Sequence, residues 1–224
     1  MAKTFVLVHG AWHGGWCWRR VNDRLVAKGH RVYAPTLTGV ADRSHLLSAS
    51  VNLSTHIVDI ANLIRWEEIN DVVLCGHSYG GMVVTGVADQ MPKRISALVY
   101  LDAFVPESGQ SWADLRLRDT PAGLTLPPTS AEVFRVNERD RQWVDRQCTP
   151  HPVACATEKL QLTGDHHAVP RKLYIRATDF PSVAFDRACE RARSDPRWIV
   201  KELSCGHDAM LDMPDALAEI LDAT

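Results

Sequence analysis

Residues 71–84, Asp-Val-Val-Leu-Cys-Gly-His-Ser-Tyr-Gly-Gly-Met-Val-Val, contain the pattern that decides the fold. A β-rich apolar run leads into a G-x-S-x-G pattern at positions 76–80, and a run of helical character follows it. In this strand–turn–helix context the serine sits on a sharp, strained turn with its hydroxyl above the sheet. Glycine is required at positions 76 and 80 because a Cβ there would strike the adjacent strand or helix. We therefore predict a nucleophile at Ser78; the alternative is a tight turn with a capping serine.

Short β-rich runs alternate with longer amphipathic stretches along most of the chain, which predicts a mainly parallel sheet covered by helices. The predicted strands are nearly continuous in hydrophobicity, as strands buried on both faces should be. They cover residues 4–9, 31–35, 71–75, 95–101, 172–177 and 198–203. Apolar residues recur at helical spacing over residues 18–26, 57–64, 82–88, 183–192 and 216–221. The expected architecture is a single α/β domain, residues 1–224, built on a six-stranded sheet.

The middle of the chain differs in composition, since seven of the twelve prolines fall between residues 106 and 170. The alternation of strands and helices stops there. We interpret residues 106–170 as an insertion between the fourth and fifth strands, partly helical over 132–146, that forms a small cap and covers one edge of the sheet. A long disordered loop is the alternative, but Trp112, Phe134 and Trp143 favour a packed segment.

Charge and cysteine content exclude several functional classes. The chain has 25 Lys+Arg and 27 Asp+Glu, which gives no electrostatic reason to expect a nucleic acid or an anionic membrane as a partner, because such partners require a concentrated basic face. The first apolar run, residues 5–8, is too short for a signal peptide or a membrane span, which predicts a cytoplasmic protein. Six cysteines without a CxxC pair argue against a disulfide framework and a cysteine-based zinc site. The oligomeric state stays open between a monomer and a homodimer.

A serine hydroxyl needs a base to take its proton, and His207 is the best-placed histidine. It follows the last predicted strand, in a glycine-containing loop before the terminal helix. The other histidines are weaker candidates. We interpret His9 and His77 as residues that flank glycine turns, His13 as part of the site entrance, His30, His45, His56 and His151 as loop or surface residues, and His166 and His167 as a solvated loop.

Two carboxylates could orient His207. Asp102 ends the fourth predicted strand, and Asp179 ends the fifth. A carboxylate within an apolar run, such as Asp102, needs a partner that offsets its desolvation, whereas Asp179 could simply cap the helix that begins near Ser182. Asp102 is therefore the first candidate and Asp179 the second.

Acyl transfer also requires donors for the developing oxyanion. The backbone N–H of Tyr79, at the start of the helix after the serine, is one predicted donor. The loop after the first strand, Val-His-Gly-Ala-Trp-His-Gly-Gly-Trp at 8–16, is rich in glycine and supplies the other, which we assign to Ala11. Because the nucleophile, the base and the donors are all protein groups, we expect neither a metal nor a cofactor.

These motifs resemble the α/β-hydrolase superfamily, and within it the plant methylesterases, hydroxynitrile lyases and their bacterial esterase relatives. The resemblance rests on residues 5–18, 76–81 and 206–207 and covers most of the chain, with the insertion matching the family's cap. It implies oxyanion N–H groups at Ala11 and Tyr79. The plant enzymes carry their acid at the position of Asp179, in a loop that is one residue shorter here. Haloalkane dehalogenases of the superfamily can carry it one strand earlier, at the position of Asp102.

The motifs and the resemblance together predict a carboxylesterase that acts through Ser78, His207 and Asp102 or Asp179, and the near-neutral charge suits a small, largely apolar ester as its substrate. Similar hydroxynitrile lyases have threonine and lysine where this chain has Gly10 and Asp208. An anion beside the base disfavours a cyanide leaving group, so hydrolysis is preferred. The candidate pocket residues are Trp12, His13, Trp112 and Trp143. The alternatives are a lyase-like or other cofactor-free enzyme on the same fold, and a small-molecule receptor that does not catalyse.

Overall fold

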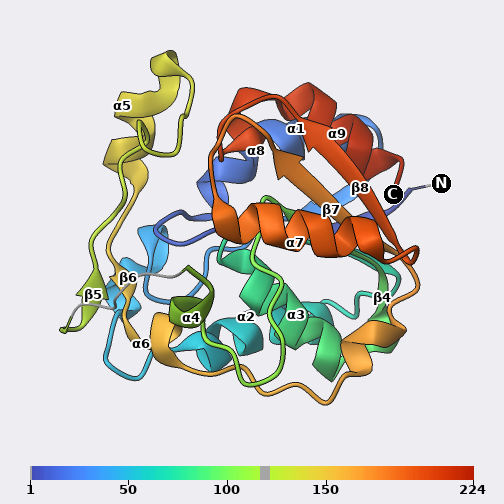
Figure 1. Ribbon diagram of the computed structural model, residues 1–224, viewed down its shortest axis with the longest axis horizontal. Helices are drawn as coiled ribbons and strands as arrows, with labels where there is room; N and C mark the ends of the chain where they lie inside the picture. Colours follow the sequence, from blue (N-terminus) through green and yellow to red (C-terminus); the bar gives the residue numbers. More distant parts are fainter. Residues whose placement is uncertain (1, 117–121) are drawn as a thin grey trace.

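A six-stranded parallel sheet forms the centre of the molecule (Figure 1). The structure is a computed structural model that describes residues 2–116 and 122–224. The strand order is β2-β1-β3-β4-β7-β8, and every neighbouring pair is parallel. These strands are β1 (Thr4–Val8), β2 (Arg31–Tyr33), β3 (Val72–His77), β4 (Ile95–Leu101), β7 (Lys172–Ala177) and β8 (Trp198–Leu203). The predicted six-stranded sheet is confirmed, although β2 and β8 are partly exposed because they lie at its edges.

Helices cover both faces of the sheet. Alternate strand residues point to opposite faces, so Val6 and Val8 belong to one apolar core and Phe5 and Leu7 to the other. The first core is closed by α2 (Leu53–Trp66), α3 (Gly80–Gln90) and α7 (Val183–Ser194), and the second by α1 (Arg19–Ala27), α8 (Ala209–Asp212) and α9 (Pro214–Asp222). Short 3-10 helices connect these elements: η1 (Gly15–Trp18), η2 (Ala41–Leu46) and η3 (Pro92–Arg94). None of the described helices has the length and apolar content needed to cross a bilayer.

The turn between β3 and α3 has the geometry that the sequence pattern predicts. Ser78 has a φ of +53°, in the left-handed region that side chains rarely occupy. A Cβ at Gly76 would lie 2.6 Å from the Gly80 carbonyl oxygen, and a Cβ at Gly80 would lie 2.8 Å from the carbonyl oxygens that end β1. The two glycines therefore let α3 begin in contact with both strands.

The first part of the insertion lies over the carboxyl ends of the strands and not along an edge, so that expectation was wrong, while its last part packs against the end of α3 at Asp89. The insertion contains α4 (Trp112–Arg116), β5 (Thr125–Leu126), α5 (Glu138–Gln147), β6 (His151–Pro152), α6 (Ala154–Thr157) and η4 (Asp165–Ala168). Loops that follow β1 and β8 hold its first part in place: Trp12 Nε1 donates to the Leu126 carbonyl at 3.1 Å, and His207 N–H donates to the Phe134 carbonyl at 2.8 Å. Figure 1 shows α5 and the antiparallel β5–β6 pair beside the sheet body. Residues 117–121 of the predicted insertion lie outside the described residues.

Gly76→Ala tests the close approach of β3 and α3. We expect the free energy of unfolding to fall by about 3 kcal/mol, the upper end for overpacking, because backbone atoms of Gly80 cannot move aside. The measurement is urea unfolding followed by circular dichroism. Gly29→Ala is the matched control: Gly29 has a φ of +86° but an added Cβ meets nothing within 4 Å, so only backbone strain of about 1 kcal/mol is expected. Equal losses in both variants would contradict the steric account.

Candidate active site

Loops from the carboxyl ends of the strands enclose a cavity of about 560 Å³. Ser78, after β3, and His207, after β8, both line it. Most of the remaining wall is apolar, with six aromatic side chains at Trp12, Phe104, Trp112, Phe134, Phe180 and Phe185. A cavity of this size with few polar groups in an apolar wall is typical of a small-molecule site.

The backbone around Ser78 is closely packed. Its N–H donates to the Leu101 carbonyl at 3.2 Å, and its own carbonyl accepts from the N–H groups of Gly81 and Phe104. A Cβ at Gly10 would lie 2.9 Å from the Cβ of Ser78, so the loop after β1 passes directly beside the serine. This contact brings the Ala11 segment next to Ser78, which the Tyr79 N–H directly follows in the sequence. Neither of these two N–H groups has an acceptor among the described residues, which leaves both able to bind an oxyanion.

His207 is held by contacts that include Asp102, His77 and Phe185. Its Nδ1 lies 2.6 Å from Oδ2 of Asp102 and donates to it, because an ionised carboxylate can only accept. Its backbone carbonyl accepts from Nε2 of His77 at 3.0 Å, and its ring stacks on Phe185 with centroids 5.3 Å apart. The neutral tautomer with hydrogen on Nδ1 leaves Nε2 as the basic nitrogen.

Asp102 supplies the carboxylate that contacts His207. Its side chain is fully buried at the end of β4, with Oδ1 accepting from Arg176 at 2.6 Å and from the Ala177 N–H at 3.2 Å. Arg176 comes from the neighbouring strand β7 and offsets the desolvation of the carboxylate. Asp179 is exposed, and its carbonyl accepts from Arg135. Of the two candidate acids, the structure therefore brings Asp102, and not Asp179, to His207.

Two of the four predicted pocket residues line the cavity. Trp12 and Trp112 form part of its wall. His13 and Trp143 do not line it, so the prediction was wrong for these two residues. His13 is buried beneath the site and contacts Asp208, while Trp143 packs edge-on against Trp16 with ring centroids 4.9 Å apart.

Sequence reasoning missed two features of the site. Arg176 follows the apolar run of residues 173–175 in the strand next to the one that ends before Asp102, and a cation after such a run is a detectable signal for a buried ion pair. Phe104, Phe180 and Phe185 reach the cavity from loops and from α7. Their sequence context resembles that of ordinary core residues, so the pattern gave no signal of their position.

His56 and His151 are fully buried, and interpreting them as surface residues was wrong. Together with Cys155 they form a cluster whose ligand atoms lie within 4.8 Å of one another. The hydrogen bonds of His151 disfavour metal binding, because its Nδ1 accepts from the Trp12 N–H. A ligating histidine normally donates its second nitrogen to an acceptor, which His151 cannot do here. The cluster instead packs the insertion against Tyr79 and Trp12.

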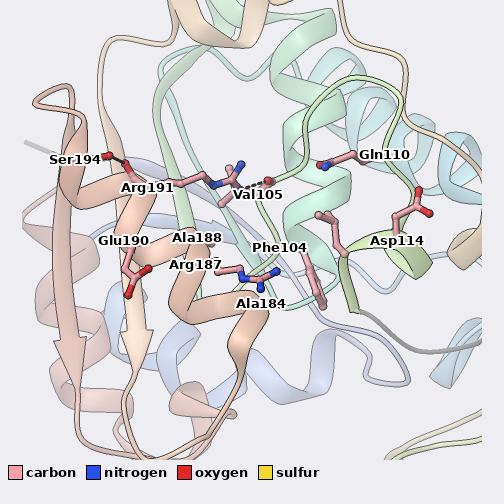
Figure 2. A pocket seen from close by; sticks show the side chains of 11 residues that line it. Phe104, Val105, Gln110, Asp114, Ala184, Arg187, Ala188, Glu190, Arg191 and Ser194 are labelled. Carbon is pink, nitrogen blue, oxygen red and sulfur yellow. Dashed lines mark hydrogen bonds between the residues drawn. The ribbon is translucent and has the colours of Figure 1, made fainter.

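A second cavity, of about 640 Å³, adjoins the first and shares Phe104 and Ala184 with it. It lies between α7 and the segment of residues 104–115. Figure 2 shows Arg187 directed from α7 toward Phe104, while Arg191 is engaged with Glu107 and the Val105 carbonyl. Ser194 also lines this hollow, and its hydroxyl donates to the Arg191 carbonyl at 2.8 Å.

The doubly covered parallel sheet and the serine on its strained turn define an α/β-hydrolase. The chain belongs to that family: the model described as "Alpha/beta hydrolase family" matches residues 5–220. It is similar to a carbendazim hydrolyzing esterase from Nocardioides sp. (strain SG-4G), with 44% identity over 98% of each chain. It is also 37% identical to methylesterase 2 from Arabidopsis thaliana, over 49% of this chain and 42% of the plant protein.

Solved structures give the same result for the fold. An extracellular α/β-hydrolase from a Paenibacillus species, described as homologous in structure and function to tobacco salicylic acid binding protein 2, aligns with a TM-score of 0.84. That alignment has 25% identity and covers 99% of this chain and 98% of the other. The resemblance inferred from the sequence is confirmed, and the protein is an enzyme of the carboxylesterase type.

Arg176→Gln tests the buried charge network. Removing the cation leaves the Asp102 carboxylate without its main compensation, and we expect a loss of about 3–5 kcal/mol in the free energy of unfolding. Urea unfolding at neutral pH measures it. Arg197→Gln, which breaks an exposed pair with Asp195, should leave the unfolding midpoint unchanged. A small effect at position 176 would contradict the assigned role of the ion pair.

Proposed function

We propose that the protein is a serine carboxylic ester hydrolase with a catalytic triad of Ser78, His207 and Asp102. In the first half-reaction Ser78 Oγ bonds to the ester carbonyl carbon while its proton moves to Nε2 of His207. The carbonyl oxygen becomes an oxyanion that the N–H groups of Ala11 and Tyr79 stabilise. The carbon–oxygen bond to the alcohol then breaks, and His207 returns the proton to the departing alcohol.

Water completes the reaction in the second half. It attacks the acyl-enzyme carbonyl as His207 takes one of its protons, and collapse of the intermediate breaks the bond to Ser78 Oγ. The serine recovers the proton and the carboxylic acid is released. The observation that carries this proposal is the 2.6 Å contact between His207 and Asp102, because it fixes the imidazole as a base in the cavity that Ser78 lines. Every group in this scheme belongs to the chain, so it requires no metal or cofactor.

The cavity favours a small, largely apolar ester with an aromatic part. Six aromatic side chains surround Ser78 and His207, and flat rings pack well in offset or edge-on contact with such walls. The carbendazim hydrolyzing esterase is similar over nearly the whole chain, which makes carbendazim the first substrate to assay. We propose that the enzyme acts in the cytoplasm on a free small molecule and not on a nucleic acid or a membrane.

The buried position of Asp208 also favours hydrolysis over cyanide release, but not because its charge lies beside the base. Asp208 does not line the cavity as an anion beside the base; its carboxylate is buried and paired with His13. The position that carries lysine in similar hydroxynitrile lyases therefore offers no cation to a leaving cyanide.

Ser78→Ala is expected to abolish turnover of p-nitrophenyl acetate, because it removes the hydroxyl that forms the acyl-enzyme in the proposed mechanism. Initial rates by release of p-nitrophenol measure it, with circular dichroism confirming that the variant is folded. A folded variant that keeps full turnover would sink the mechanism.

Asp102→Asn and Asp179→Asn should separate the two candidate acids. We expect kcat to fall about 10⁴-fold at position 102, since an amide at that site stabilises the wrong tautomer of the base. Asp179→Asn should stay within about threefold of the native enzyme, because the Asp179 side chain is exposed. The same assay applied to both variants measures the difference. A collapse at position 179 with little change at 102 would contradict the assignment.

A further inference from the structure

We propose that His13 is a positioning residue of this esterase: paired with Asp208 beneath the cavity, it holds the loop that bears the Ala11 N–H against the loop that bears His207. The inference rests on the proposed function, because it takes Ala11 as an oxyanion donor and His207 as the base. Neither His13 nor Asp208 lines the reaction cavity. Their effect must therefore reach the substrate through the two loops.

The hydrogen bonds of His13 define its charge. Nδ1 lies 2.8 Å from the Ala11 carbonyl oxygen, and Nε2 lies 3.0 Å from Oδ2 of Asp208. A carbonyl oxygen and an ionised carboxylate can only accept, so both ring nitrogens must donate. The side chain is therefore an imidazolium cation, and it stacks on Trp16 with ring centroids 5.2 Å apart.

The pair is a buried cross-link between two distant segments. The side chains are 1% and 0% exposed, and the residues are 195 positions apart in the sequence. Burial alone would lower the pKa of His13 and raise that of Asp208. The charge and hydrogen bond of the partner reverse both tendencies, so the pKa of His13 is raised and that of Asp208 is lowered. Breaking such a pair on one side leaves an uncompensated charge in the interior, which is strongly unfavourable.

The remaining titratable groups around the pair do not replace the cation. Burial lowers the pKa of His9 to about 3, strongly lowers that of His77, and raises those of the Cys17 and Cys148 thiols. His77 Nε2 lies 3.8 Å from Oδ1 of Asp208 but donates to the His207 carbonyl. His207 directs its own Nδ1 to Asp102. The buried negative charge of Asp208 is therefore balanced by the positive charge of protonated His13.

His13 also restrains the peptide group that follows the Ala11 N–H. The carbonyl of this peptide accepts from His13, and its N–H, which belongs to Trp12, donates to Nδ1 of His151 at 3.4 Å. Trp12 has a φ of +67°, which a residue other than glycine keeps only when its surroundings hold it there. Two buried histidines thus fix the two polar ends of one peptide. Loss of His13 removes the restraint on the carbonyl end and lets the Ala11 donor turn away from the oxyanion.

The ion pair of His13 and Asp208 should hold the two loops together only within a limited pH range. Because the pKa of His13 is raised, its contribution is complete below its ordinary value of 6.5 and is lost as the pH rises through the raised value. Because the pKa of Asp208 is lowered, the acid limit lies below its ordinary value of 3.8. The native enzyme should therefore lose activity on the alkaline side as His13 gives up its proton.

The experiment compares His13→Gln, Asp208→Asn and the double variant with the native enzyme, using kcat and KM for p-nitrophenyl acetate from pH 6 to 10. We expect each variant to lower kcat at pH 7 by about 10–100-fold, less than the full loss of an oxyanion donor, with KM within about threefold. The alkaline decline of the native enzyme should be absent. The double variant replaces the ion pair with two amides and leaves no unpaired buried charge, so it keeps the test valid if a single variant does not fold.

His166→Gln is the matched control. His166 pairs with Asp89 at 3.0 Å, like His13 with Asp208, but Asp89 lies near the far end of α3, eleven residues after Ser78. It should change stability without changing kcat or the alkaline decline. The proposal is overturned if folded His13→Gln or the double variant keeps the native kcat, or if either keeps the native alkaline decline. If the proposed esterase mechanism itself were wrong, Ser78→Ala would remain active, and this result would distinguish that failure from a failure of the His13 proposal alone.

Discussion

The backbone of Ser78 is the constraint on which the site depends. A left-handed φ of +53° at a residue with a side chain persists only because β1, β3 and α3 leave the turn no other conformation. The glycines at 76 and 80 allow these elements to meet at backbone contact distance, and the Gly10 loop passes beside the serine. Since the N–H of Tyr79 begins α3 and Ala11 follows Gly10, the same contacts that strain the turn also place the two N–H groups that we propose as oxyanion donors. The proposed nucleophile and its electrostatic support would thus be a single feature of the fold.

Two buried ion pairs extend this arrangement to His207. Asp102 on β4 meets Arg176 on β7, the next strand in the sheet, and offers its second oxygen to His207. Asp208, the residue after His207, meets His13 from the loop after β1. Buried ion pairs contribute little net stability compared with apolar replacements, but their geometry is specific. Here that specificity is used to fix loops from distant parts of the chain around one cavity.

The sheet, the serine turn and the presence of His207 in the cavity were predictable because each has a local signature. The strand periods and the G-x-S-x-G pattern depend on residues that are neighbours in sequence. The choice between Asp102 and Asp179 was not decidable in this way, since it depends on which carboxylate is turned inward and on Arg176 from another strand. Contacts between distant segments also explain why His13 was wrongly predicted in the pocket and why His56 and His151 were wrongly predicted as loop or surface residues. Their burial depends on where the insertion lies, and neither the proline content nor the aromatic residues of that segment define its position.

The most direct test of the account is covalent labelling with diisopropyl fluorophosphate, followed by intact-mass measurement and peptide mapping. The account predicts one adduct per chain, located on Ser78, with ester turnover lost in proportion to labelling. An adduct on another residue, or turnover that survives complete labelling of Ser78, would contradict it.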